Sequence, residues 1–161
     1  MSDKREGEIA VDIDPATQQP DAGLIFIGRI RSPWKTRAEC PKNIRQARER
    51  RPENCSLEID PQWRPGLTGL EAGSFIHILY WMHDARRDLI MQKPRHRQTA
   101  TGVFSLRSPV RPNPVALALV QILDIDVHSG HIAIEATDAL DGTALIDIKP
   151  YLETVDAPYC V

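Results

Sequence analysis

Two arginines stand at the ends of a short proline-containing segment. Arg107 closes the apolar stretch GVFSLR (Gly102–Arg107), and Arg111 follows four residues later in RPNP. A guanidinium group is planar and permanently charged, so it can bind a carboxylate or a phosphate through two hydrogen bonds. The prolines around Arg111 lower the entropic cost of ordering this segment on a ligand. The pair therefore predicts an anion site, although Arg111 could instead pair with Asp138 or Asp141 and lock its own loop.

An acidic segment, DALDGT (Asp138–Thr143), lies in the C-terminal part of the chain. Asp-Gly between two apolar stretches is a strong signal for a tight turn. Gly142 would also let the backbone approach a ligand closely, since it has no side chain. From the residues alone, a turn is the default interpretation of this segment.

His83 and Asp84 lie at the end of the long β-prone run SFIHILYWMH (Ser74–His83). Polar side chains at a strand end can leave the core and meet a ligand. His77 lies on the same side of the strand as His83, because side chains alternate along a strand. Their separation along an extended strand is about 20 Å, which excludes a metal ion shared by the two histidines.

The formal net charge of −2 conceals an uneven distribution. Nine Lys and Arg with two acids occupy residues 29–51, and seven with one acid occupy residues 86–111. Residues 115–161 carry eight acids and one base. This segregation indicates an anionic partner, such as nucleic acid, for the basic segments. The alternative is that the basic segments are solvated and pair with the acidic part of the chain.

Length and composition bound the class of protein. The chain has 161 residues, 42% of them hydrophobic, which fits one globular domain. Three scattered cysteines (Cys40, Cys55 and Cys160) exclude a disulfide scaffold and a zinc knuckle. The N-terminus has no apolar signal core, and the longest apolar run, Phe75–Met82, is too short for a membrane helix. We therefore expect a soluble, cytoplasmic protein.

The elements that must position these residues are mostly strands. Turn-forming residues separate about seven β-prone stretches, without the alternation of strands and helices that marks a parallel sheet. The stretches are Leu24–Ile30, Cys55–Asp60, Ser74–His83, Gly102–Arg107, Val115–Val127, His131–Ala136 and Ala144–Ile148. A short basic helix is expected over Ile44–Arg51, and a long loop over Asp84–Thr101. The fold class is therefore mainly β, with a few short helices and long loops, and a barrel would remove exposed strand edges.

Four blocks of sequence resemble the TsaA/TrmO (YaeB-like) family. They are IGRIRSPWKTRAECPKN (Ile27–Asn43), GLTGLEAGSFIHILYWMH (Gly66–His83), GVFSLRSPVRPNP (Gly102–Pro114) and DALDGTALIDIKPY (Asp138–Tyr151). Their order and spacing are similar to the family's pattern over roughly residues 24–155. Two features depart from it. Val115-Ala116 follows RPNP where Ile-Gly is common, and we expect the additional C-terminal domain of longer members to be absent.

The resemblance implies a YaeB-like β-barrel that binds S-adenosylmethionine (SAM), usually as a homodimer. Residues 1–22 would form a disordered tail, residues 23–155 the barrel domain and residues 156–161 a C-terminal tail. Carboxylates such as Asp138 and Asp141 would be favourable beside SAM, because SAM carries a sulfonium and an ammonium group. The residues that match the family's cofactor contacts are Pro41, Lys42, Asn43, His83, Asp84, Arg107, Leu117, Asp138, Leu140, Asp141, Gly142 and Thr143.

The resemblance also implies a reaction. Characterised members N6-methylate threonylcarbamoyl-adenosine beside a tRNA anticodon, so we expect a SAM-dependent tRNA methyltransferase. No residue is identified as the catalytic base, although His83 or Asp138 could remove a proton. A SAM-binding module, or a methyltransferase for another RNA or a small molecule, remains an alternative; no metal and no membrane are expected. The basic residues expected to contact RNA are Arg45, Arg48, Lys93, Arg95, Arg97 and Arg111.

Overall fold

The computed structural model describes residues 4–95 and 97–158. It divides them into two compact units. The small unit holds the described residues of Met1–Gly23 and Met82–Ala116. The barrel unit holds Leu24–Trp81 and the described residues of Leu117–Val161.

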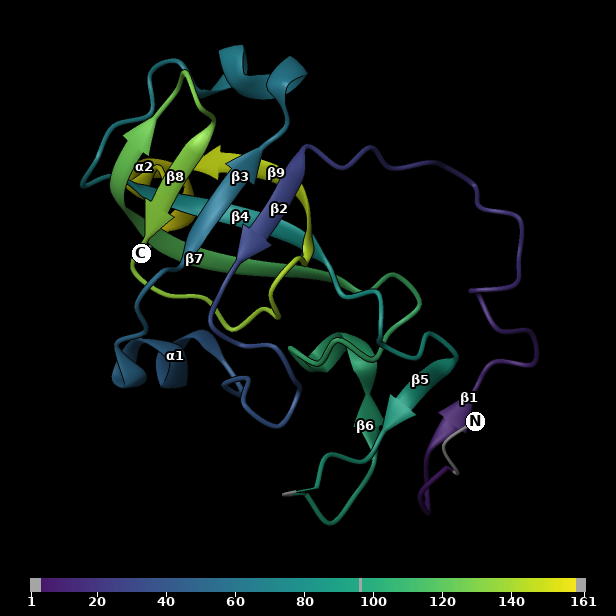
Figure 1. The fold of residues 1–161 in the computed structure, drawn as a ribbon. Coiled ribbons are helices and arrows are strands. Elements are labelled where there is room, and N and C mark those ends of the chain that lie inside the picture. Colours follow the sequence, from purple (N-terminus) through teal and green to yellow (C-terminus); the bar gives the residue numbers. More distant parts are fainter. Residues whose placement is uncertain (1–3, 96, 159–161) are drawn as a thin grey trace. The chain divides into compact units, whose positions relative to one another are not determined.

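Antiparallel strands form a closed barrel in the order β2-β3-β8-β7-β4-β9 (Figure 1). This confirms the mainly β class and the barrel expected from the sequence. The first two residues of β7 belong to the small unit. The strands are β2 (Gly28–Arg31), β3 (Ser56–Ile59), β4 (Phe75–Trp81), β7 (Val115–Asp126), β8 (His131–Ile134) and β9 (Ala144–Pro150).

The barrel is filled by side chains that alternate along its strands. On β4, Ile76, Ile78 and Tyr80 are at most 3% exposed, whereas Phe75 is 42% exposed. Burying each Ile or Leu contributes about 1.5–3 kcal/mol. The other large apolar residues of this core are Ile30, Leu57, Ile59, Val120, Ile122, Ile132, Ile134 and Leu145.

Strand β2 closes the barrel because it pairs on both sides. Gly28 lies opposite Ile59 on β3 and opposite Leu145 on β9. The backbones approach closely here: a Cβ atom on Gly28 would lie 2.0 Å from the carbonyl oxygen of Glu58. The sequence predicts a strand over Leu24–Ile30, but β2 begins only at Gly28. The side chains that precede β2, such as Ile25, are exposed.

Three short helical elements belong to the barrel unit. They are α1 (Ile44–Arg50), the 3₁₀ helix η1 (Pro61–Leu67) and α2 (Glu153–Asp156). The predicted basic helix is confirmed as α1, which buries Ala47. Among the residues described in either unit, no helix has the length and apolar character needed to cross a membrane.

The small unit contains a three-stranded sheet in the order β1-β5-β6. Its elements are β1 (Ile9–Ala10), β5 (Leu89–Gln92), β6 (Thr101–Gly102) and the 3₁₀ turn η2 (Val103–Ser105). Two local predictions are wrong: the expected loop over residues 84–101 contains β5, and half of the strand expected over residues 102–107 is η2. Backbone bonding accounts for η2, since the amide of Leu106 donates to the Val103 carbonyl at 3.1 Å.

Strand β1 lies within residues 1–22, for which the sequence predicts a disordered tail. It pairs with β5, placing Ile9 opposite Met91. The predicted domain boundaries at residues 22/23 and 155/156 stay predictions. His96 and residues 159–161, which include Cys160 and half of the expected C-terminal tail, lie outside the described residues.

Candidate functional site

The acidic turn Asp138–Thr143 connects β8 to β9. Gly142 has φ of 79°, in the left-handed region that favours glycine, and the predicted Asp-Gly turn is confirmed. The Gly142 amide donates to the Ile30 carbonyl at 2.8 Å, and the Asp141 amide donates to the Trp34 carbonyl at 2.9 Å. These bonds fasten the turn to β2 and to the loop that follows β2.

The Asp141 carboxylate adds a second set of bonds to the same loop. One oxygen accepts from Lys35 Nζ at 2.8 Å, and the other accepts from the Ser32 amide at 3.2 Å. A guanidinium nitrogen of Arg31 lies 3.8 Å from the first oxygen. The hydrogen bond from Lys35 lowers the pKa of Asp141 most strongly; burial opposes this, and Ser32 and Arg31 lower the pKa further. Asp141 is therefore a carboxylate at neutral pH and holds the turn in place.

We expect Asp141→Asn to lower the melting temperature at pH 7 and to have a smaller effect in acid. Because the pKa is lower in the folded state, the carboxylate stabilises the fold above its unfolded pKa of about 3.9. That contribution is lost as the pH falls through the folded pKa. Since its partner Lys35 is 66% exposed, the effect at pH 7 should be about 1 kcal/mol, or a few degrees.

Calorimetry of both proteins between pH 7 and pH 2.5, at about half-unit steps, measures this difference. Asp147→Asn is a matched control, because its ion pair with Lys149 is exposed on both sides. A difference in melting temperature that persists unchanged in acid would contradict the role assigned to Asp141.

Asp138 joins the turn to β4. One carboxylate oxygen accepts a hydrogen bond from the Tyr80 hydroxyl at 2.8 Å, and the Asp138 carbonyl accepts from Cys40 Sγ at 3.1 Å. Tyr80 is 3% exposed, so its hydroxyl reaches the turn from the barrel core. Burial and the Asp138 charge raise the pKa of Cys40 to about 11. The thiol therefore stays protonated at neutral pH and is a poor nucleophile.

The loop Pro41–Asn43 leads directly into α1. Pro41 is buried and Lys42 is exposed. The Asn43 side chain accepts from the Gln46 amide at 2.9 Å, while the Gln46 side chain accepts from the Lys42 amide at 2.7 Å. This reciprocal cap satisfies two backbone donors at the helix start. It gives the Asn43 side chain a structural role, and its contact with a cofactor stays a prediction.

The other cofactor candidates are distributed over both units. Leu140, Gly142 and Thr143 belong to the acidic turn, where Thr143 Oγ1 donates to the Leu140 carbonyl at 2.7 Å. Leu117 lies on β7 and is 45% exposed. In the small unit, His83 and Asp84 follow β4; both are exposed, with 3.5 Å between His83 Nε2 and an Asp84 oxygen.

Arg107 lies in a loop of the small unit that Arg111 holds together. Arg111 donates to the carbonyl oxygen of Ser108 at 2.9 Å, to that of Val103 at 3.2 Å and to that of Leu106. Leu106 and Ser108 are the two neighbours of Arg107. The guanidinium of Arg111 is thus bonded to backbone on both sides of Arg107, which makes Arg111 a positioning residue for that loop.

A second arginine supports the same loop. Arg87 Nε donates to the Pro112 carbonyl at 2.5 Å, and the Met82 amide donates to the Pro114 carbonyl at 2.9 Å. Carbonyl groups of the RPNP segment thus accept hydrogen bonds from residues 82–87. The predicted contact of Arg111 with RNA stays a prediction.

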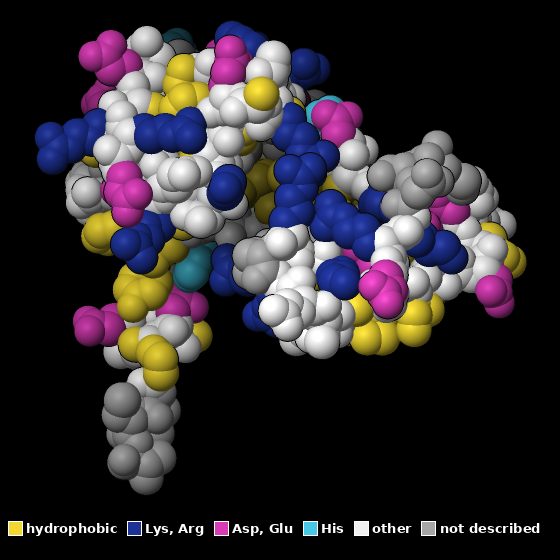
Figure 2. Space-filling model, turned by 90° about the horizontal axis from the view of Figure 1, so that it is seen from below, with side chains coloured by type: hydrophobic (Ala, Val, Ile, Leu, Met, Phe, Trp, Pro, Cys, Tyr) yellow, Lys and Arg dark blue, Asp and Glu magenta, His cyan; other side chains and the backbone are white. Residues whose placement is uncertain are grey.

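The basic residues of α1 have partners within the barrel unit. Arg45 pairs with Glu49 at 3.1 Å, and Arg48 binds Glu135 at 2.7 Å and the Leu119 carbonyl at 2.7 Å. Arg48 therefore ties α1 to the barrel, whereas Arg45, with its side chain 88% exposed, reaches solvent. Lys and Arg side chains (dark blue) are prominent on the surface, with acidic side chains among them (Figure 2).

The sequence did not identify the residues that bind the acidic turn from other segments. Ser32, Lys35 and Tyr80 bind the acidic turn from segments about 60 to 110 positions away. No local pattern could identify them, because such contacts depend on barrel closure. The described residues hold no group of three His, Cys, Asp or Glu that could bind a metal ion.

Comparison with known proteins shows the family of this chain. The family model described as "tRNA-methyltransferase O N-terminal domain" matches residues 29–157. The chain belongs to this family. A Rhizobium radiobacter relative, "Probable S-adenosyl-L-methionine-binding protein VirR", is 42% identical over 146 residues, which are 91% of this chain and 78% of the relative. A Mus musculus relative, "tRNA (adenine(37)-N6)-methyltransferase", is 38% identical over 95 residues, which are 57% of this chain and 22% of the relative.

Solved structures of the TrmO family share the fold. The crystal structure of TrmO from Pseudomonas aeruginosa superimposes with a TM-score of 0.64 at 26% identity, over 86% of this chain and 60% of that chain. The chain thus spans about three fifths of the solved TrmO chain. Every cofactor candidate, from Pro41 to Thr143, lies within the residues that match the TrmO N-terminal domain, whereas β1 precedes them.

Proposed function

We propose that this chain is a SAM-dependent methyltransferase that acts on tRNA. The observation that carries the proposal is the match to the tRNA-methyltransferase O N-terminal domain over residues 29–157. The names of two relatives support its two halves: one is a probable SAM-binding protein, and the other is a tRNA adenine-N6-methyltransferase. The finer reaction we propose is N6-methylation of threonylcarbamoyl-adenosine next to the anticodon.

The residues of the barrel unit fit the chemistry of SAM. The cofactor presents a sulfonium, an ammonium, a carboxylate and an adenosine. Asp138 and Asp141 lie on a turn whose backbone is fixed by the hydrogen bonds to Ile30 and Trp34. Because Asp141 already binds Lys35 and Ser32, Asp138 is the carboxylate proposed to face a cation, and Asp141 would hold the turn. A carboxylate that is already ordered attracts a nearby cation without a further loss of conformational entropy. Gly142 has no side chain, so a ligand could approach its backbone closely.

The small unit carries the other cofactor candidates. Arg107 would bind the SAM carboxylate, for which a planar guanidinium is the matching donor. The clamp formed by Arg111 fixes the backbone on both sides of Arg107, which reduces the entropy lost on binding. His83 and Asp84 are exposed and can reach a ligand.

Bound SAM supplies an activated methyl group. The work left to the protein is to hold the acceptor nitrogen in line with that group at near-attack distance, which accounts for much of the acceleration in such reactions. A proton must also leave the nitrogen. His83 and Asp138 are the candidate acceptors, and the bond from Tyr80 fixes the direction of the Asp138 carboxylate.

The basic residues proposed from the sequence to contact RNA differ in exposure. Arg45 in the barrel unit and Arg95 and Arg97 in the small unit are exposed, whereas Lys93 and Arg111 are half-buried. A tRNA substrate would place the protein in the cytoplasm, and we propose a homodimer as in the family. Phosphate contacts by these residues would provide affinity and positioning, with little sequence information.

Two measurements test the proposal. Calorimetry with SAM should detect binding at micromolar to millimolar cofactor, and its absence would refute the assignment. The purified protein should then transfer a labelled methyl group to tRNA from a strain that lacks this methylation. Nucleoside mass spectrometry should find the label on threonylcarbamoyl-adenosine. SAM binding with the label on another nucleoside would indicate a different RNA substrate. SAM binding without any labelled RNA would favour a binding module or a small-molecule substrate.

A further inference from the structure

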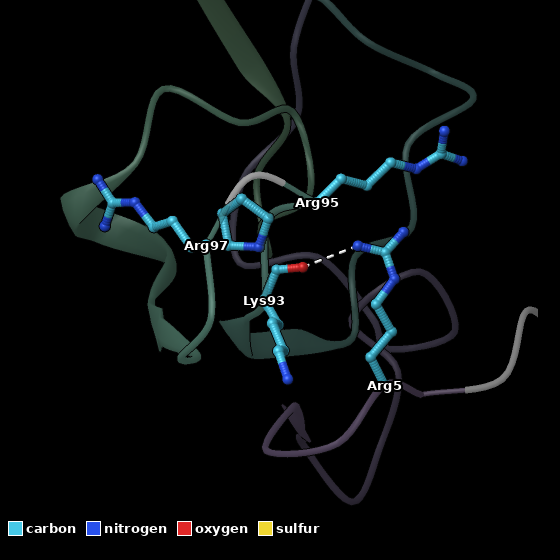
Figure 3. Close-up of a pocket in the computed structure, with 5 residues that line it drawn as sticks. Arg5, Lys93, Arg95 and Arg97 are labelled. Atoms are coloured by element: carbon cyan, nitrogen blue, oxygen red, sulfur yellow. Dashed lines mark hydrogen bonds between the residues drawn. The ribbon is translucent and has the colours of Figure 1, made fainter.

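A basic cavity lies in the small unit, and one of its lining residues, Arg5, precedes the residues matched by the family. It has a volume of about 300 Å³ and is lined by Arg5, Lys93, Pro94, Arg95 and Arg97 (Figure 3). Four of these five residues are cationic. Arg5 comes from the N-terminal segment, and the others follow β5. The cavity therefore exists only because the two segments lie together within this unit.

The N-terminal segment is held beside β5 by backbone pairing. Strand β1 pairs antiparallel with β5, and the Val11 amide donates to the Asp88 carbonyl at 2.8 Å. Arg5 itself donates from Nη1 to the Lys93 carbonyl at 2.8 Å (Figure 3). The guanidinium is thus held at the wall of the cavity by a hydrogen bond to a backbone carbonyl group.

Glu8 strengthens the same connection. Its two carboxylate oxygens accept from the Arg5 amide and the Lys93 amide, each at 3.0 Å. Burial by itself would raise the pKa of Glu8, but these hydrogen bonds and the charges of Arg5 and Arg86 lower it overall. The carboxylate therefore stays ionised and links the two segments. The other nearby acid, Glu6, is 95% exposed and lies 3.9 Å from Lys93 Nζ, which makes it a weak competitor for an anion.

The cations do not converge on one point. Arg5 and Arg95 extend to the same side, Arg97 extends to the opposite side, and the Lys93 side chain points in a third direction (Figure 3). A single phosphate ion would engage only part of this set. Successive phosphates along a nucleic-acid backbone would engage several members at once, and such contacts need charge and reach more than exact geometry.

We propose that Arg5 and the N-terminal segment are part of the RNA-binding surface, where Arg5, Lys93, Arg95 and Arg97 bind phosphates of the tRNA backbone. This inference rests on the proposed function, since it takes tRNA as the polyanion. It adds a segment that the family match does not include. In this proposal, the pairing of β1 with β5 holds the segment that contains Arg5 beside the cavity.

Binding of tRNA to Arg5→Gln, followed by fluorescence anisotropy across a range of salt concentrations, tests the inference. At about 0.1 M salt we expect affinity to fall about fivefold, and the slope of log K against log salt to fall by about one, because one phosphate contact is lost. Arg5→Lys should restore most of the affinity by restoring the charge. Lys4→Gln removes an equal charge one position away, outside the cavity lining, and should change the slope much less.

The outcomes distinguish a failure of this inference from a failure of the proposed function. If the unaltered protein binds tRNA and Arg5→Gln binds equally well with the same slope, the inference is wrong while the proposed function stands. An equal loss in Lys4→Gln would also overturn it, because net charge alone would then explain the change. If the unaltered protein does not bind tRNA, both fail. SAM affinity and melting temperature should be unchanged in Arg5→Gln, which excludes a general loss of structure.

Discussion

Arg107→Ala should abolish SAM binding at concentrations where the unaltered protein is saturated. Two charge-assisted hydrogen bonds to a carboxylate are together worth about 3 kcal/mol or more, which is at least a hundredfold in Kd. The side chain is exposed on a loop, so its removal creates no core cavity. Titration calorimetry of both proteins with SAM measures the effect, and thermal unfolding should show an unchanged melting temperature.

A matched control makes this prediction sharper. Arg95→Ala removes another exposed arginine of the small unit and should reduce tRNA affinity while sparing SAM affinity. Arg107→Ala should show the opposite pattern. If Arg107→Ala retains normal SAM affinity, the assignment of Arg107 to the cofactor is refuted, whatever happens to RNA binding.

Gly28→Ala should destabilise the barrel severely. The added Cβ would lie 2.0 Å from the Glu58 carbonyl oxygen and 3.0 Å from Ile59 Cα. Both neighbours are backbone atoms of β3, so relief requires the strands to separate. Because Gly28 also pairs with Leu145 on β9, this shift would loosen both sides of β2. We expect a loss of about 3 kcal/mol or failure to fold, at the upper end of the overpacking range.

Urea unfolding monitored by tryptophan fluorescence measures the loss. Gly66→Ala is the control, because a Cβ there would meet nothing within 4 Å. The control should unfold within about 0.5 kcal/mol of the unaltered protein. A Gly28→Ala protein as stable as this control would show that β2 and β3 do not need their close approach.

The barrel could be predicted from sequence because its longer strands carry a regular pattern. β4 alternates buried and accessible residues from Phe75 to Trp81, and the turn at Ser129-Gly130 separates β7 from β8 as expected. The sheet of the small unit could not be predicted. Strands β1 and β6 have two residues each, too few for any periodicity, and their pairing with β5 is a long-range event.

The candidate site was predictable only in part. The Asp-Gly turn follows from local residue types, whereas the cofactor residues came from the family resemblance. The hydrogen-bond partners of Asp138, Asp141 and Arg111 could not be predicted from the sequence. Tyr80 and Lys35 meet the turn only when the barrel closes, and Arg111 bonds to carbonyl groups, which every residue possesses and no sequence pattern marks.

The pairing of β2 with β9 has a consequence for folding during synthesis. β2 is the first strand of the barrel to be synthesised and β9 is the last, yet they are neighbours. Until residues 144–150 leave the ribosome, the nascent chain presents two unpaired strand edges, one on β2 and one on β4. Open edges of this kind recruit other chains. In the interval before β9 is synthesised, the nascent chain therefore has two open strand edges that the finished barrel lacks.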